Sequence, residues 1–212
     1  MPAAEPTLIC HWPQQPALPP CGQAVLVRVV SPQPRWAARR ELRAVLRQVL
    51  AAWSGLPPGQ LPLEETPRGP IWRGQLRGET LDISLSYGTE EGWLGLIRGG
   101  WIGVDTMSVE PFAEAENVAR YYLGPVAAAG IRKAADPARA FAAAWTQREA
   151  RLKCLKRGLV EWTATQAQTE AECLCHPLVL SDRVIGAVTT RLAWLGYSTR
   201  KTWGALPSCL PM

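Results

Sequence analysis

Apolar positions recur along the chain with the periods of two long helices and several strands. At residues 35–53 apolar side chains return every three or four positions and arginines fill much of the remainder, which predicts an amphipathic, basic helix. Asp136 followed by Pro137 resembles an N-cap with proline at the first helical position, and it predicts a second helix that runs to about Arg157 and stops at Gly158. Apolar or alternating runs predict strands at residues 24–30, 81–87, 92–98, 101–105, 172–180 and 183–192.

Proline and glycine mark the segments between these elements. Residues 1–22 hold six prolines, a density that excludes a continuous helix and predicts an extended arm. Residues 54–77 are interpreted as a linker, and Gly99-Gly100 favours a tight hairpin between the strands on either side. The last residues are expected to be a polar, poorly ordered tail. Helices and strands occur in both halves, which indicates an α+β fold and permits two similar lobes.

The composition indicates a globular protein with a mild positive charge. Apolar residues make up 47% of the 212 positions and charged residues 19%, which argues against extended disorder. The net charge of +5 is spread along the chain, and it suits a partner with phosphates or an acidic protein surface. No secretory signal precedes the six cysteines, so they are interpreted as reduced thiols in a cytoplasmic protein. No run approaches the ~20 apolar residues of a membrane span.

A glutamate and a lysine share one face of the second predicted helix. Trp145, Glu149 and Lys153 are four residues apart and form one stripe. A solvated ion pair worth about 0.3 kcal/mol is the simplest interpretation of Glu149 and Lys153, although the tryptophan suggests partial burial. Asp105 ends a predicted strand. It is either a turn residue or, with Glu149, one of the two oxygen ligands that commonly hold Mg²⁺ on substrate phosphates.

Two motifs resemble those of a known family. Ile102-Gly103-Val104-Asp105 is similar to a Gly-Val/Ile-Asp strand, and residues 145–153, Trp-Thr-Gln-Arg-Glu-Ala-Arg-Leu-Lys, are similar to a Trp-x-x-Lys-Glu-Ala-x-x-Lys helix. Both motifs occur in the 4'-phosphopantetheinyl transferases. The chain resembles their large monomeric class, typified by the surfactin-synthetase-activating enzyme. The 43 residues between Asp105 and Glu149 are also typical of the family, and the resemblance covers roughly residues 35–159.

The resemblance implies two similar α+β lobes packed as a pseudo-dimer, each with a small antiparallel sheet and a long helix. The arm of residues 1–22 would precede an N-terminal lobe at 23–100 and a C-terminal lobe at 101–212 that carries the metal and catalytic residues. The implied activity is of the holo-[acyl-carrier-protein] synthase type. A monomer would transfer the 4'-phosphopantetheine of coenzyme A to a serine of an acyl or peptidyl carrier protein and release adenosine 3',5'-bisphosphate.

The resemblance also implies a role for each site residue. Asp105 and Glu149 would bind Mg²⁺, Glu149 would act as the base for the serine hydroxyl, and Lys153 would stabilise the leaving oxygen. The residues expected to bind coenzyme A are Arg35, Arg40, Arg68, Ser84, Arg148 and Lys153.

Some positions depart from the family pattern and motivate an alternative. Met107 stands where the family has a second carboxylate, Leu85 replaces a histidine that helps to hold coenzyme A, and Lys156 replaces a glycine after the helix. The alternative is a catalytically degenerate module that binds coenzyme A or a carrier protein. A third hypothesis, a nucleic-acid-binding module that uses the arginine-rich helix, has no recognised motif in its favour, and we expect no nucleic-acid or membrane partner.

Overall fold

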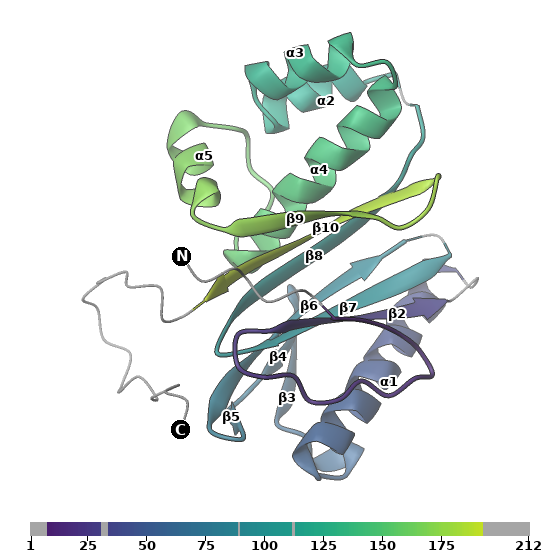
Figure 1. Ribbon diagram of the computed structural model, residues 1–212, viewed down its shortest axis with the longest axis vertical. Coiled ribbons are helices and arrows are strands. Elements are labelled where there is room, and N and C mark those ends of the chain that lie inside the picture. The colour runs from purple at the N-terminus through teal and green to yellow at the C-terminus, as the bar shows by residue number, and fades with distance from the viewer. Residues whose placement is uncertain (1–7, 31–33, 89, 112, 193–212) are drawn as a thin grey trace.

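The protein has a mixed α+β fold, and its described residues form three β-sheets and five α-helices (Figure 1). The computed structural model describes residues 8–30, 34–88, 90–111 and 113–192. The expected C-terminal tail and the first seven residues of the proline-rich arm lie outside these ranges. No helix within them is both long enough and apolar enough to cross a membrane.

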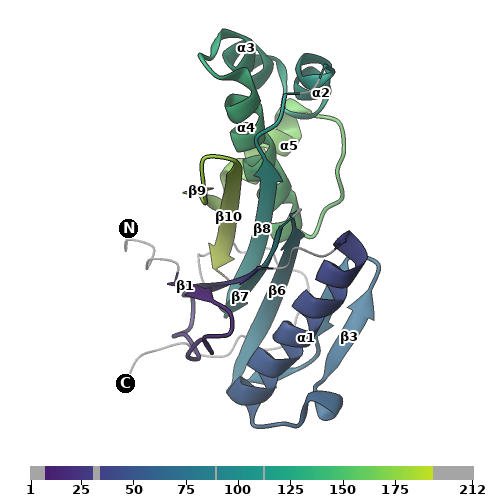
Figure 2. The same ribbon diagram turned by 90° about the vertical axis from the view of Figure 1, so that its right-hand side faces the viewer.

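The largest sheet has five strands and carries α1 (Arg35–Ser54) on one face (Figure 2). In spatial order the strands are β1 (Leu8–His11), β2 (Ala24–Val30), β7 (Glu91–Arg98), β6 (Glu79–Tyr87) and β5 (Gln75–Leu76). β7 pairs antiparallel with β2 and β6, whereas β1 runs parallel to β2. Leu42, Leu46 and Leu50 of α1 are fully buried in the core of this half. The apolar stripe predicted for the helix is therefore the face that packs on the sheet.

A second, antiparallel sheet supports the other long helix, α4 (Pro137–Cys154). Its strands in spatial order are β8 (Gly100–Ser108), β10 (Val184–Leu192) and β9 (Leu174–Val179). The Asp136 carboxylate accepts a hydrogen bond of 2.9 Å from the backbone N–H of Arg139, which confirms the predicted N-cap. Three shorter helices lie around α4 in Figure 1, namely α2 (Ala115–Tyr122), α3 (Pro125–Lys133) and α5 (Ala164–Ala171).

The segment predicted to be a linker contains regular structure. After a short 3-10 turn, η1 (Pro58–Gln60), the strands β3 (Leu63–Thr66) and β4 (Gly69–Trp72) form a separate antiparallel pair. The side chain of Trp72 is buried in the core beneath α1. The composition of residues 54–77 did not predict these strands, because proline and glycine are usually depleted in strand interiors.

The two larger sheets meet where β6 lies beside β8, and side chains of β6 make the connecting hydrogen bonds. Oxygen atoms at alternate positions of β6 accept hydrogen bonds from backbone N–H groups at alternate positions of β8. The pairs are Asp82 with Ile102 (2.7 Å), Ser84 with Val104 (2.9 Å) and Ser86 with Thr106 (3.0 Å). Alternate residues of a strand point to the same face, so this row of contacts fixes the register between the two sheets.

The predicted positions of both long helices and of the strands are confirmed, but the predicted hairpin is wrong. β8 follows β7 after one residue, yet it pairs with β10 and lies in the other sheet. Gly99, with φ of 69°, redirects the chain between them. Gly95 of β7 has no side chain where Val104 of β8 packs against it, so β8 crosses β7 closely without joining its ladder.

The helix α4 lies directly on β8 because of a glycine in that strand. A Cβ atom at Gly103 would overlap the carbonyl oxygen of Ala150 and would lie 2.6 Å from the backbone nitrogen of Cys154. Both atoms belong to the backbone of α4 and have no freedom to move aside. Gly103 therefore sets the distance between the strand and the helix.

We predict that Gly103→Ala destabilises the protein by roughly 1–3 kcal/mol or more, because the added methyl group must displace the backbone of α4. Gly130, within α3, is the matched control, since a Cβ atom there meets no atom within 4 Å. Gly130→Ala should stabilise the protein by about 0.5–1 kcal/mol. Chemical denaturation of both variants measures the difference, and equal stability of the two would contradict the close contact at Gly103.

Candidate active site

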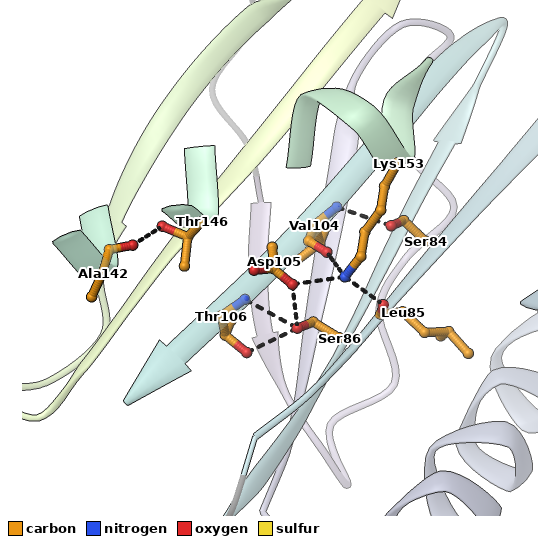
Figure 3. Close-up of polar contacts among 9 residues, drawn as sticks. All are labelled: Ser84, Leu85, Ser86, Val104, Asp105, Thr106, Ala142, Thr146 and Lys153. Atoms are coloured by element: carbon orange, nitrogen blue, oxygen red, sulfur yellow. Dashed lines mark hydrogen bonds and ion pairs between the residues drawn. The ribbon is translucent and has the colours of Figure 1, made fainter. Parts of the chain in front are cut away.

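The contact between β8 and α4 brings the two motifs of the sequence together. Asp105 lies on β8, and Glu149 and Lys153 lie one turn apart on α4. The Lys153 Nζ donates to Asp105 Oδ1 at 2.7 Å, which joins the strand motif to the helix motif directly (Figure 3). These residues are distant in sequence, and the close packing of α4 on β8 that Gly103 permits brings them together in space.

Lys153 uses all of its hydrogen-bonding capacity within the protein. Besides Asp105, its ammonium group donates to the carbonyl oxygen of Val104 at 2.9 Å and to that of Leu85 at 3.3 Å (Figure 3). An ammonium group has three N–H donors, so all three are engaged. Lys153 consequently ties α4 to both β8 and β6.

Burial raises the pKa of both carboxylates of the site. Burial raises the pKa of Asp105, and the ion pair with Lys153 and a hydrogen bond of 3.3 Å from the Ser86 hydroxyl oppose that rise. Burial also raises the pKa of Glu149, and the negative charge of Asp105 raises it further, against the attraction of Lys153 and Arg148. Within the described residues, the Glu149 carboxylate accepts no hydrogen bond. It is therefore the member of the group best placed to take up a proton or a cation.

A cavity of about 350 Å³ opens beside Glu149 and Lys153. Its walls come from α1, the turn between β3 and β4, β6, α4 and the segment after α4. The cationic residues that line it are Arg39, Arg43, Arg68, Lys153, Lys156 and Arg157. Among the described residues of the lining, Glu149 carries the single negative charge. The cavity therefore favours a ligand with several negative charges, such as one with phosphate groups.

Some of the residues predicted to bind coenzyme A line this cavity and others lie elsewhere. Arg68 and Ser84 line it, as Lys153 does. Arg40 lies outside the lining, with its guanidinium group 5.9 Å from the ring of Trp36. The side chain of Arg35 lies outside the described residues.

Arg148 lies apart from the cavity, in a buried contact with α5. It is 5% exposed, donates to the carbonyl oxygen of Val160 at 3.1 Å and approaches Glu170 at 3.7 Å. Consecutive residues of a helix point about 100° apart, so the side chains of Arg148 and Glu149 leave α4 in different directions. The predicted contact between Arg148 and coenzyme A stays a prediction.

The wall of the cavity formed by α1 carries a group of residues that the motifs did not predict. Arg43 donates to the Tyr87 hydroxyl at 2.9 Å and to Glu65 at 3.0 Å, and Arg39 lies 5.4 Å from the ring of Tyr87. Arg39 and Arg43 are four residues apart on α1, so their shared face was visible in the sequence. Whether that face lines the cavity depends on how α1 packs on the sheet, and the sequence pattern of the helix alone does not contain this information.

Comparison with known proteins agrees with this geometry. Residues 102–177 match the family model of the 4'-phosphopantetheinyl transferase superfamily. The match begins in β8 and ends in β9, so it contains Asp105, Glu149 and Lys153. Members of this superfamily act on coenzyme A and carrier proteins, so the match supports a transferase. A search of curated proteins finds no match to the chain.

The segment that matches the superfamily model has Met107 where the resemblance leads us to expect a second carboxylate. Met107 packs against a buried apolar cluster that includes Ile131 and Phe141, and Trp145 packs against the same cluster. Leu85, which stands in place of a histidine, lines the cavity and contributes its backbone oxygen to Lys153. Both substitutions therefore place an apolar side chain where the family resemblance suggested a polar one.

The remaining carboxylates fit a divalent cation. The described residues contain no group of three or more His, Cys, Asp or Glu side chains able to hold a metal ion. Mg²⁺ on substrate phosphates is commonly held by one or two carboxylates, with phosphate oxygens and water completing its shell. Asp105 and Glu149 repel each other and Glu149 lacks a partner in the described structure, so a cation bound by both would offset that repulsion.

We predict that Glu149→Gln raises stability at neutral pH. Folding raises the pKa of Glu149, so the folded protein holds that proton more tightly than the unfolded chain does. The charged form therefore costs stability at pH values above the folded pKa, and the cost fades as the pH falls below the unfolded value of about 4.3. Thermal unfolding from pH 4 to pH 8 should show a gain for the variant at pH 8 that disappears near pH 4.

The exposed Glu110 serves as a control for the loss of one negative charge, because it lies outside the cavity lining. A gain for Glu149→Gln that is no larger than that of Glu110→Gln, or that persists undiminished at pH 4, would contradict the electrostatic account of the site.

Proposed function

We propose that the protein transfers the 4'-phosphopantetheine group of coenzyme A to a serine of an acyl or peptidyl carrier protein. One observation carries the proposal. Glu149 and Lys153 line a cavity that has six cationic side chains, Lys153 among them, and Lys153 contacts Asp105; all three residues belong to the segment that matches the superfamily. Coenzyme A has a diphosphate and a 3'-phosphate, and it thus presents the charge that such a cavity favours.

The residues of the site suggest how the transfer proceeds. The serine oxygen attacks the phosphorus that bears the pantetheine group. The bond from this phosphorus to the bridging oxygen of the diphosphate breaks, and the bridging oxygen leaves as part of adenosine 3',5'-bisphosphate. Glu149 accepts the serine proton, and its raised pKa suits a general base. Lys153 stabilises the leaving oxygen, since its longest hydrogen bond, 3.3 Å to Leu85, is the one it gives up most easily. Asp105 and Glu149 would hold Mg²⁺, which neutralises charge on the diphosphate.

The remaining parts of the proposal follow from the same resemblance. Two lobes would meet near residue 100, one built on α1 and the larger sheet and one on α4 and the sheet of β8, as in a pseudo-dimer. The net charge of +5 would favour an acidic carrier protein, mainly through faster association. We propose a monomer, because in that arrangement a single chain supplies both halves of the cavity.

A second candidate function is the binding of coenzyme A or a carrier protein without transfer. Two observations favour it. Met107 is directed into an apolar cluster, which removes one carboxylate from the site, and Lys153 spends its three donors on protein oxygens. In this alternative, Lys153 would be a structural tie between the two sheets.

Mass spectrometry of carrier proteins separates the two candidates. The protein is incubated with coenzyme A, Mg²⁺ and a panel of apo carrier proteins, and we expect at least one carrier to gain the mass of the phosphopantetheine arm. The gain should disappear when the carrier serine is replaced by alanine. Tight binding of coenzyme A in calorimetry, without transfer to any carrier, would support the binding module and contradict the enzyme.

We predict that Glu149→Gln lowers the transfer rate about 10²–10⁴-fold, because the variant loses the group that accepts the serine proton. The same variant is expected to be at least as stable as the natural protein at neutral pH, so unfolding cannot explain the loss. Quantified transfer under saturating coenzyme A measures the effect. A rate within tenfold of the natural protein would remove Glu149 from the role of base.

A further inference from the structure

Lys156 occupies a backbone position that suits glycine. The helix α4 ends at Cys154, and two residues later Lys156 has φ of 57°, in the left-handed region. Residues with a Cβ atom adopt this conformation reluctantly, apart from asparagine and aspartate. Backbone strain of this kind is often found at functional sites. Here the left-handed residue also ends α4, because Lys156 N–H donates to the carbonyl oxygen of Lys153 at 3.1 Å and Arg157 N–H to that of Leu152 at 2.8 Å. The backbone needs a left-handed residue at this position, whereas the contacts of the lysine side chain need a separate explanation.

Two contacts fix Lys156 between separate segments of the cavity wall. Its Nζ donates to Asp82 Oδ2 on β6 at 2.7 Å. Its backbone carbonyl oxygen accepts a hydrogen bond of 2.8 Å from Arg68, in the turn between β3 and β4. Lys156 and Arg68 both line the cavity. The strained turn therefore places two cationic residues side by side at one ligand-facing surface.

The hydrogen-bond donors of Lys156 are largely unused, in contrast to those of Lys153. Lys156 spends one of three N–H donors on Asp82, and Arg68 spends one of five on the carbonyl oxygen of Lys156. The described residues accept no further hydrogen bond from either side chain. The Lys156 side chain is 46% exposed, against 31% for Lys153. Of the two lysines beside the site, Lys156 is the one with donors ready for a ligand.

Asp82 holds the ammonium group without removing it from the cavity. Its carboxylate also accepts the backbone N–H of Ile102, so it is fixed to β8. Burial raises the pKa of Asp82, and the positive charge of Lys156 opposes that rise. The ion pair therefore favours the charged forms of both groups. An ammonium group anchored through one donor keeps its direction and offers two donors to phosphate oxygens.

We propose that Lys156, with Arg68 positioned by its carbonyl oxygen, forms an anion-binding pair for the phosphate groups of a bisphosphorylated nucleotide. The inference rests on the proposed function, since it assigns a further binding residue to the same cavity. Neither the match to the superfamily nor the two motifs in the sequence assigns a ligand to Lys156. The unused donors at a strained position carry the assignment.

Calorimetric binding of adenosine 3',5'-bisphosphate tests the pair, and it needs neither a carrier protein nor turnover. Lys156→Gly removes the ammonium group and relieves the backbone strain, and we expect about tenfold weaker binding, in line with the loss of charge-assisted hydrogen bonds. Lys156→Asn, which tolerates the left-handed backbone, should weaken binding equally. Because either change leaves the buried Asp82 without its partner, Lys156→Gly is also compared with its parent in an Asp82→Asn background. The loss should be about tenfold there too.

Lys133→Gln is the matched control, because it removes one positive charge at the end of α3, outside the cavity lining, and should leave the affinity within twofold. Affinities for Lys156→Gly within twofold of the parent in both backgrounds would overturn the inference and leave the proposed function standing. A natural protein that binds no bisphosphate at millimolar concentration would overturn both.

Discussion

The ammonium group of Lys153 is the contact on which the candidate site depends. It reaches from α4 to a carbonyl oxygen on β6, a carbonyl oxygen on β8 and the carboxylate of Asp105. A single cation thereby binds oxygens of two strands, and it joins three elements that are remote in sequence. The ion pair also opposes the effect of burial on Asp105, because an opposite charge at 2.7 Å counters the rise in its pKa that desolvation causes. Without this tie, a buried carboxylate would lie unpaired between two sheets.

The polar contacts between the sheets have a second consequence for the site. The oxygens of Asp82, Ser84 and Ser86 take the place of a backbone ladder between β6 and β8. A backbone ladder would have brought β8 into the larger sheet and left its outer face free. Side-chain bonding instead lets β8 belong to the smaller sheet while its position against β6 stays fixed. Asp105 thus belongs to a strand of the smaller sheet, while its carboxylate is held next to β6 of the larger sheet.

Local patterns were sufficient to predict the long elements and the residues at the centre of the site. Capping residues and helical spacing placed Glu149 and Lys153 on one face of α4. The strand that contains Asp105 was also recognised, although Asp105 does not end it, since β8 continues to Ser108. The strands β3, β4 and β5 were missed because they are short and because prolines and glycines surround them. The pairing of β8 with β10 rather than β7 was missed because sequence neighbours usually pair, and nothing local shows that Gly95 and Gly103 favour close crossing over a hairpin.

The opposite wall of the cavity illustrates the limit of motif reasoning. Arg39 and Arg43 face the site only because α1 packs on the larger sheet with that side toward Tyr87. Lys156 looked like a departure from a glycine-containing motif, whereas the structure shows what its side chain contacts. Residues outside a family's motifs gain their neighbours through tertiary packing, and a sequence pattern contains little of that information.

The hydrogen bond from Arg68 to the carbonyl oxygen of Lys156 joins residues 88 positions apart and lies on the rim of the cavity. The rim is thus closed by contacts between the first and second halves of the chain, and a ligand seated there touches both. Any such ligand would act as an additional cross-link between the halves. Its binding energy would therefore resist their separation, and the resistance of this boundary to proteolysis would report occupancy of the cavity.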